Sequence, residues 1–272
     1  MKQLSALLLL ASASAAFAQG LEFYTPLGGM PGDTGFENAQ QQDASPRFRA
    51  ALGAGVAVAP TYPGADGYRA HLAPAIHLAY GPVFFGIGGL GVNLYRGAGW
   101  RFGVNLMPGR GRDESDDPHL SGLGNVDRTW RGGVFAVYFR EGYLARGSVS
   151  TDIAGHHQGT LARFDVYARR PVGDGLVLFA GPGLTWADRN YTQTFFGVTP
   201  AQSAASGLPQ FDAGAGVSSA RVSAGAVYRL APRWRLLSSY SYARLTGDAG
   251  SSPITENRNQ QFVAVSAVYL VR

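Results

Sequence analysis

The chain has 272 residues, of which 46% are hydrophobic and only 15% charged, with 38 glycines, 12% aromatic residues and no cysteine. The lack of cysteine excludes disulfides and Cys-ligated metals, and the composition favours a Gly-rich, aromatic-rich β-barrel over a soluble core. The formal net charge of +5 rests on arginine, because the only lysine is Lys2.

The N-terminus has the pattern of a secretory signal peptide over residues 1–18. A short positive region at Met1-Lys2 precedes an apolar stretch at 4–10 and a small-x-small cleavage site at 16–18. No segment approaches the roughly 20 apolar residues that a spanning helix needs, so an exported chain enters a membrane only as a closed barrel. We therefore expect export to the bacterial outer membrane. Nucleic acid is a poor partner for such a protein.

Residues 19–46 are rich in Gly, Pro and Gln without periodicity, and we interpret them as a flexible periplasmic lead. From 47 to 272 apolar and polar residues alternate, as in strands with one face toward lipid and one toward a polar lumen. In 68–80, for example, Tyr68, Leu72 and Tyr80 share one face. The opposite, lumen-lining faces are predicted to carry Arg69, Arg101, Arg146, Asp152, Arg163, Asp165 and Arg221.

About eleven strands can be counted, although single-chain bacterial barrels have even numbers. The segment 83–95 changes phase at Gly88-Gly89, which marks either a tight turn between two short strands or a bulge. The sequence thus predicts an all-β, antiparallel, up-and-down transmembrane barrel of about 12 strands, with about 10 as the alternative.

We find no convincing set of catalytic residues, and the sequence predicts no enzyme, cofactor or metal site. The acidic run 113–117 beside Arg110 and Arg112 is either a solvated, self-paired surface loop, which we favour, or a site for a divalent cation. Phe195 and Phe196 are adjacent aromatics in a polar loop, so at least one should fold over the lumen. With Tyr191 they form a candidate mouth loop, acting as a constriction, a docking lid or a structural plug.

Arginine binds phosphate through two hydrogen bonds and keeps its charge when partly desolvated. Rim arginines could therefore hold lipopolysaccharide phosphates, and lumen arginines could favour anions in a pore. The alternative is that the lumen arginines simply pair with Asp152 and Asp165.

Several loop segments resemble the MltA-interacting protein family, also called MipA/OmpV. They cover nearly the whole mature chain in order, and comprise Pro60–Tyr68, Gly109-Arg110, Trp186, Asn190–Val198, Ser206–Pro209, Leu245–Ala249 and Ser252–Ile254. The resemblance implies an outer-membrane barrel. One departure is Arg272, which stands where such barrels usually end in an aromatic residue.

The resemblance also implies a non-enzymatic scaffold that joins a lytic transglycosylase to a peptidoglycan synthase. Other members of the family are discussed as porins or adhesins. A small, anion-preferring porin is therefore the alternative, while a lipid-modifying enzyme lacks a catalytic set. Lipid and lipopolysaccharide of the outer membrane are expected surroundings in each case.

Overall fold

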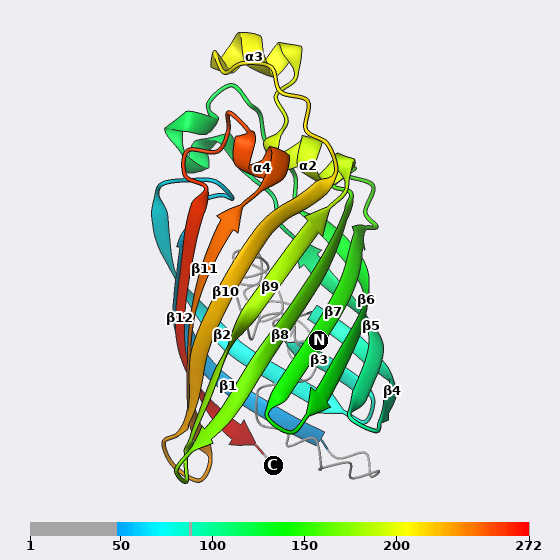
Figure 1. Cartoon of the computed structure of the whole chain (residues 1–272), viewed down its shortest axis with the longest axis vertical. Helices are drawn as coiled ribbons and strands as arrows, with labels where there is room; N and C mark the ends of the chain where they lie inside the picture. Colours follow the sequence, from blue (N-terminus) through cyan, green and yellow to red (C-terminus); the bar gives the residue numbers. More distant parts are fainter. Residues whose placement is uncertain (1–47, 87–88, 272) are drawn as a thin grey trace, which may run out of the picture.

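The computed structural model describes residues 48–86 and 89–271 (Figure 1). The predicted signal peptide (1–18) and the whole predicted lead (19–46), together with Arg47, lie outside this range. Antiparallel strands form one closed barrel in which sequence neighbours pair and β1 closes against β12. The strands are β1 (Phe48–Pro60), β2 (Tyr68–Tyr80), β3 (Val83–Gly86), β4 (Gly89–Gly97), β5 (Trp100–Gly109), β6 (Thr129–Arg140), β7 (Tyr143–Asp152), β8 (Thr160–Val172), β9 (Leu176–Ala187), β10 (Gly216–Arg229), β11 (Trp234–Leu245) and β12 (Asn259–Val271).

The prediction of about 12 strands is confirmed. The phase change near Gly88-Gly89 marks a hairpin, because β3 and β4 pair antiparallel with Gly86 opposite Gly89. Its two connecting residues, 87–88, are outside the described residues. The hairpin is short: β3 has 4 residues, whereas β2 has 13.

The two ends of the barrel differ in their connections. One end has tight turns, such as 81–82, 98–99 and 141–142, while the other carries the long connections 110–128, 188–215 and 246–258. In outer-membrane barrels short turns face the periplasm and long loops face outward. We call these the periplasmic end and the outer end.

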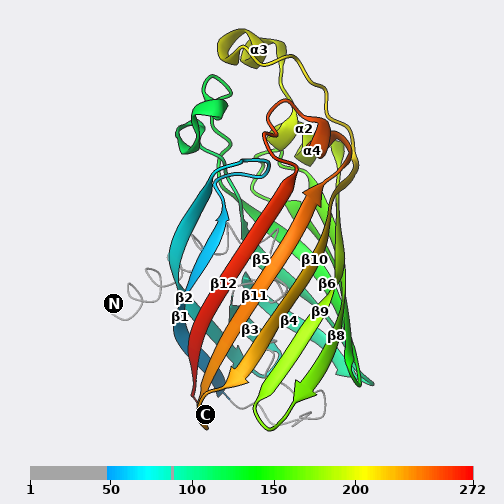
Figure 2. The same cartoon turned by 60° about the vertical axis from the view of Figure 1, so that its left-hand side comes forward.

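Short helices occupy the outer end. Figures 1 and 2 place α2 and α4 directly over it, with α3 farther from the barrel. They are α2 (Arg189–Phe196), α3 (Pro200–Ser206) and α4 (Gly247–Ser251), with 3-10 turns η1 (Glu114–Asp116) and η2 (Pro118–Leu120). Within the described ranges, no helix combines the length and the hydropathy needed to cross a membrane.

The alternation of side chains separates the outside of the wall from the lumen. On β2, Leu72 points outward and is 87% exposed, while on β5 Phe102 is exposed between the buried Arg101 and Asn105. Exposed aromatics such as Tyr80 and Trp130 stand near strand ends, where membrane interfaces lie. This is the pattern of a lipid-facing wall around a partly polar interior.

Candidate functional site at the outer end of the lumen

Apolar side chains fill the lumen near the periplasmic end. They project from most strands of the barrel and form one buried cluster of Ala79, Phe84, Phe135, Val137, Leu144, Tyr167, Phe179 and Val227. Three of the rings lie over glycines of the adjacent strand: Phe84 opposite Gly91, Phe135 opposite Gly103, and Phe179 opposite Gly225. A side chain at any of these glycines would collide with the ring. The lower lumen is therefore a packed core.

A buried charge cluster lies on the lumen side of β7 to β10. Arg146 Nε donates to Asp165 Oδ2 at 2.7 Å, and the two residues are direct cross-strand partners. Arg221, two strands away, reaches the other oxygen of Asp165 and also donates to Thr185 Oγ1 at 3.0 Å. The intervening residue is Gly183, whose missing side chain leaves room for this contact.

The other predicted lumen residues are dispersed. Arg101 lies over the Phe139 ring, 5.3 Å from its centroid. Arg163 lies on the same face of β8 as Asp165. Asp152, at the outer end of β7, accepts hydrogen bonds from the backbone of loop 153–159. Arg69 lies at the outer end of β2. The structure thus brings only Arg146, Asp165 and Arg221 together.

The predicted mouth loop is a helix packed into the outer end of the lumen. Asp188 caps α2 by accepting from the Tyr191 backbone N–H at 2.8 Å. We expected at least one aromatic of this segment to fold inward, and Tyr191, Phe195 and Phe196 are all buried. They form one cluster with lumen-facing residues of the wall and with α4, namely Ala57, Ala59, Leu161, Ala187, Ala243, Leu245, Ala249 and Phe262.

Buried arginines tie α2 to the rest of the barrel. Arg131 is 1% exposed, lies 5.7 Å from the Tyr191 ring centroid and donates to backbone carbonyls of Ser150 and Gly159. Arg112 Nη1 donates to the Phe195 carbonyl at 2.9 Å. Burial lowers the pKa of Arg112.

Loops from distant parts of the sequence form a folded cap around these helices. Tyr62, Leu120, Leu123, Val198 and Ile254 share one buried apolar cluster. The Tyr62 hydroxyl donates to Glu256 Oε2 at 2.8 Å, and burial together with Glu256 raises the pKa of this tyrosine. Most of the segments that carry the family resemblance meet in this cap.

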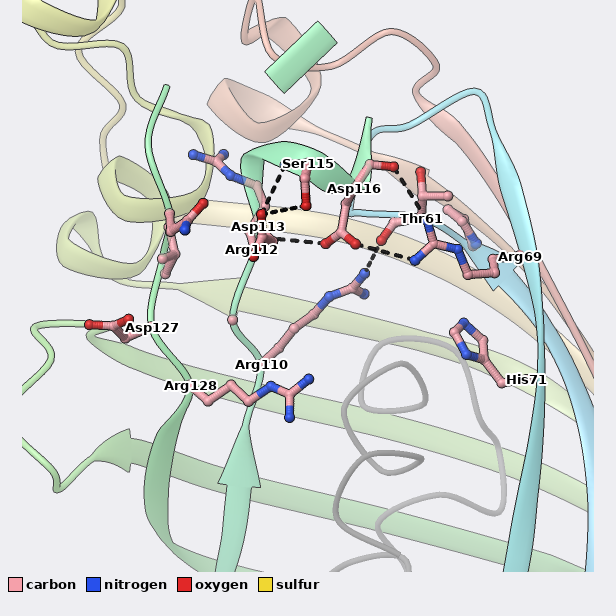
Figure 3. A pocket seen from close by; sticks show the side chains of 14 residues that line it. Thr61, Arg69, His71, Arg110, Arg112, Asp113, Ser115, Asp116, Asp127 and Arg128 are labelled. Carbon is pink, nitrogen blue, oxygen red and sulfur yellow. Dashed lines mark hydrogen bonds and ion pairs between the residues drawn. The ribbon is translucent and has the colours of Figure 1, made fainter. Parts of the chain in front are cut away.

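A cavity of about 510 Å³ lies in the outer part of the lumen, between the end of β2 and the connection 110–128 (Figure 3). Its lining is strongly charged and contains Arg69, His71, Arg110, Arg112, Asp113, Asp116, Asp127 and Arg128. Four arginines face three aspartates, so fixed positive charge is in excess.

The carboxylates of this cavity are already engaged or turned away. Asp113 accepts from the Ser115 backbone N–H at 2.9 Å and from its hydroxyl, and these bonds lower the pKa of Asp113. Asp116 pairs with Arg69 at 3.2 Å. Asp127 points away from the cavity (Figure 3), and its carboxylate lies 3.8 Å from the His156 ring.

Arg110 and Arg128 extend into the cavity from the two ends of the 110–128 connection (Figure 3). Arg110 Nη2 donates to the Thr61 carbonyl at 2.8 Å, but its Nη1 is buried without a partner. Within the described part of the chain neither arginine forms an ion pair. Sequence reasoning treated Arg110 as a neighbour of the acidic run and as part of a family-like segment, and it missed Arg128. The available signal was a basic residue at each end of a loop between membrane strands.

The acidic run 113–117 forms η1, which Asp113 caps, and supplies Asp117 as the N-cap of η2. Asp117, the last residue of this run, also belongs to a carboxylate group with Asp66 and Glu256, whose ligand atoms lie within 4.8 Å of one another. Exposed acidic groups of this kind are common without a metal. The arrangement alone therefore does not define a metal site.

Comparison with known proteins identifies the family. The family described as MltA-interacting protein MipA matches residues 52–271. The putative outer membrane protein YiaT of Escherichia coli K12 is 26% identical over 156 residues, which cover 57% of this chain and 62% of YiaT. The same protein of E. coli O157:H7 matches equally. This chain thus matches less than two thirds of the length of either relative.

Among solved structures, the NanC porin aligns with a TM-score of 0.38 and 8% identity, covering 82% of this chain and 99% of NanC. The translocator domain of the autotransporter NalP from Neisseria meningitidis aligns with a TM-score of 0.37 and 12% identity, covering 84% and 90%. These scores are too low to support an argument about function. The family match spans most of the barrel, and the strand pattern agrees with it, so this chain belongs to the MltA-interacting protein MipA family of outer-membrane β-barrels.

Proposed function

We propose that this protein is a non-enzymatic scaffold of the outer membrane, which holds a lytic transglycosylase and a peptidoglycan synthase at the periplasmic end of the barrel. The observation that carries the proposal is the packed lumen. Aromatic and aliphatic side chains form a buried cluster across its lower part, and α2 packs into its outer end beside the charged cavity. A filled barrel offers its ends as functional surfaces, rather than a path for solutes.

The periplasmic end supports this proposal through its charge. Arginines from neighbouring turns are exposed there, including Arg140, Arg170 and Arg229, against the acidic Glu141 and Asp174. Fixed charge of one sign steers a partner of opposite charge and selects among partners. We infer that acidic patches of the cell-wall enzymes dock on this basic rim. The family description names the partner MltA, a lytic transglycosylase.

Crosslinking in intact envelopes tests the proposal. The full chain should co-purify with a lytic transglycosylase, and Arg140→Glu/Arg170→Glu should reduce the recovered enzyme. The matched control is Arg189→Glu, an exposed arginine at the outer end that forms a surface ion pair with Asp212 at 2.6 Å. Equal recovery with both variants would refute docking on the basic rim, and recovery of no cell-wall enzyme would refute the scaffold.

The porin alternative has its own test. The correctly inserted wild-type protein should show no sustained single-channel conductance in a planar bilayer. Steady anion-selective conductance would contradict the packed-lumen argument and favour a channel.

A further inference from the structure

The cavity at the outer end has fixed hydrogen-bond donors without acceptors. Arg110 Nη1 is buried and has no hydrogen-bond partner among the described residues, although Arg110 Nη2 donates to the Thr61 carbonyl. Thr61 Oγ1, which belongs to another lining residue, is also buried without a partner. A buried donor that lacks an acceptor costs free energy, so a ligand that supplies acceptor oxygens is favoured here.

The charges around the cavity specify the ligand as an anion. Arg128 faces the same space as Arg110 (Figure 3) and has no ion pair with any residue that the structure describes. The nearby Asp113 and Asp116 are occupied by Ser115 and Arg69. Two guanidinium groups without carboxylates suit a phosphate group, because its oxygens accept paired N–H donors.

Among the described residues, strand pairing is interrupted in the part of the wall beside the cavity. β2 pairs with β1 along its whole length, but with β3 only through Leu78, Ala79 and Tyr80. On the β3 side, the part of β2 that carries Arg69 and His71 therefore has no strand partner among the described residues. A group anchored in the outer leaflet can approach the cavity past this edge.

The depth of the cavity agrees with such an approach. Tyr68 and Trp130 are exposed aromatics at the outer ends of β2 and β6, where aromatic residues mark the membrane interface. Arg69 follows Tyr68 directly, and Arg128 lies two residues before Trp130. The cavity therefore lies at the level of lipid headgroups.

We propose that this cavity binds a phosphate monoester, through Arg110 and Arg128, and that a phosphorylated glycolipid of the outer leaflet supplies it. The inference is independent of the scaffold proposal, because it concerns the opposite end of the barrel. Figure 3 shows Arg110 and Arg128 extending from one side of the cavity and His71 lying on the opposite side, so the phosphate would lie between them.

Titration of the full chain in detergent micelles with bis-phosphorylated lipid A tests the site. We expect Arg110→Gln/Arg128→Gln to weaken binding by at least about tenfold, because charge-assisted bonds to phosphate are lost. The single variant Arg128→Gln removes no hydrogen bond or ion pair within the described chain and should also weaken binding. Migration of the unheated barrel on a denaturing gel verifies that each variant is folded.

The matched control is Arg244→Gln, which alters an exposed arginine at the outer end of β11, outside the cavity. This variant should bind lipid A like the wild type. An equal loss in Arg244→Gln and in the double variant, or no loss in either, would overturn the proposal.

Two further probes identify the source of the phosphate. Dephosphorylated lipid A should not bind to the cavity, and its undiminished binding would overturn the proposal. Inorganic phosphate should bind much more weakly than lipid A. If it binds tightly and is lost in the double variant while lipid A does not bind, the phosphate site stands and the lipid source is refuted.

Discussion

The two sides of the barrel handle charge differently. On the side formed by β6 to β12 the strands have 10 to 14 residues, and Asp165 is matched there by Arg146 and Arg221. On the side of β2 to β5, β3 has only 4 residues, and the guanidinium groups of Arg110 and Arg128 pair with no carboxylate of the described residues. Where the strands pair along their whole length, buried arginines and aspartates form ion pairs with each other. Where strand pairing is interrupted, arginine side chains stay available to bind a ligand.

The largest effect on stability is expected at the ion pairs of Asp165 with Arg146 and Arg221. Asp165→Asn should lower the free energy of unfolding by about 3–5 kcal/mol, because two buried arginines lose their counter-ion. Chemical unfolding of the barrel in detergent, followed by tryptophan fluorescence, measures this change.

The control for Asp165→Asn is Asp212→Asn, which breaks an exposed ion pair with Arg189. Its effect should stay within about 1 kcal/mol, because solvent screens exposed pairs. If both variants lowered the free energy of unfolding by similarly small amounts, the ion pairs of Asp165 with Arg146 and Arg221 would not be shielded from solvent.

Gly183→Ala tests the same Asp165–Arg221 contact and should have a smaller effect on the free energy of unfolding. The added Cβ would lie 2.1 Å from Asp165 Oδ1 and 2.8 Å from Arg221 Nε, so the ion pair must shift. We expect a loss of about 1–3 kcal/mol in unfolding free energy, as for other overpacked sites. Gly147→Ala is the matched control, since its nearest neighbour would be 3.9 Å away. Equal stability of the two variants would show that Gly183 is not needed for the contact.

Sequence alternation was enough to predict the wall, but not the contacts inside it. Which face of a strand meets lipid depends on local periodicity, and so Leu72 and Arg101 could be assigned from the sequence. The Asp165–Arg221 contact depends on the register of β8, β9 and β10 and on Gly183 between them, which periodicity does not encode. The sequence could suggest that lumen arginines pair with Asp165, but not which arginines do so or through which atoms.

The candidate site was harder to predict for the same reason. Arg110 and Arg128 are separated by a long loop, and Arg69 lies on a strand that meets this loop only after the barrel closes. The inward turn of at least one of Phe195 and Phe196 was predicted from their apolar character, but the helix that buries both of them was not. Tertiary closure, rather than local propensity, creates the cavity.

The smallest expected effect is at the ion pair that joins the two sides of the cavity. Arg69 Nη1 lies 3.2 Å from Asp116 Oδ1, and both side chains are partly exposed to solvent. Arg69→Gln should therefore lower the unfolding free energy by no more than about 1 kcal/mol. Arg221→Gln, the same change in the matched cluster, should cost several times more, because it leaves buried partners unsatisfied. If Arg69→Gln were the more damaging of the two, the outer loop would be a structural brace of the barrel, and the distinction between a matched core and an available charged cavity would fail.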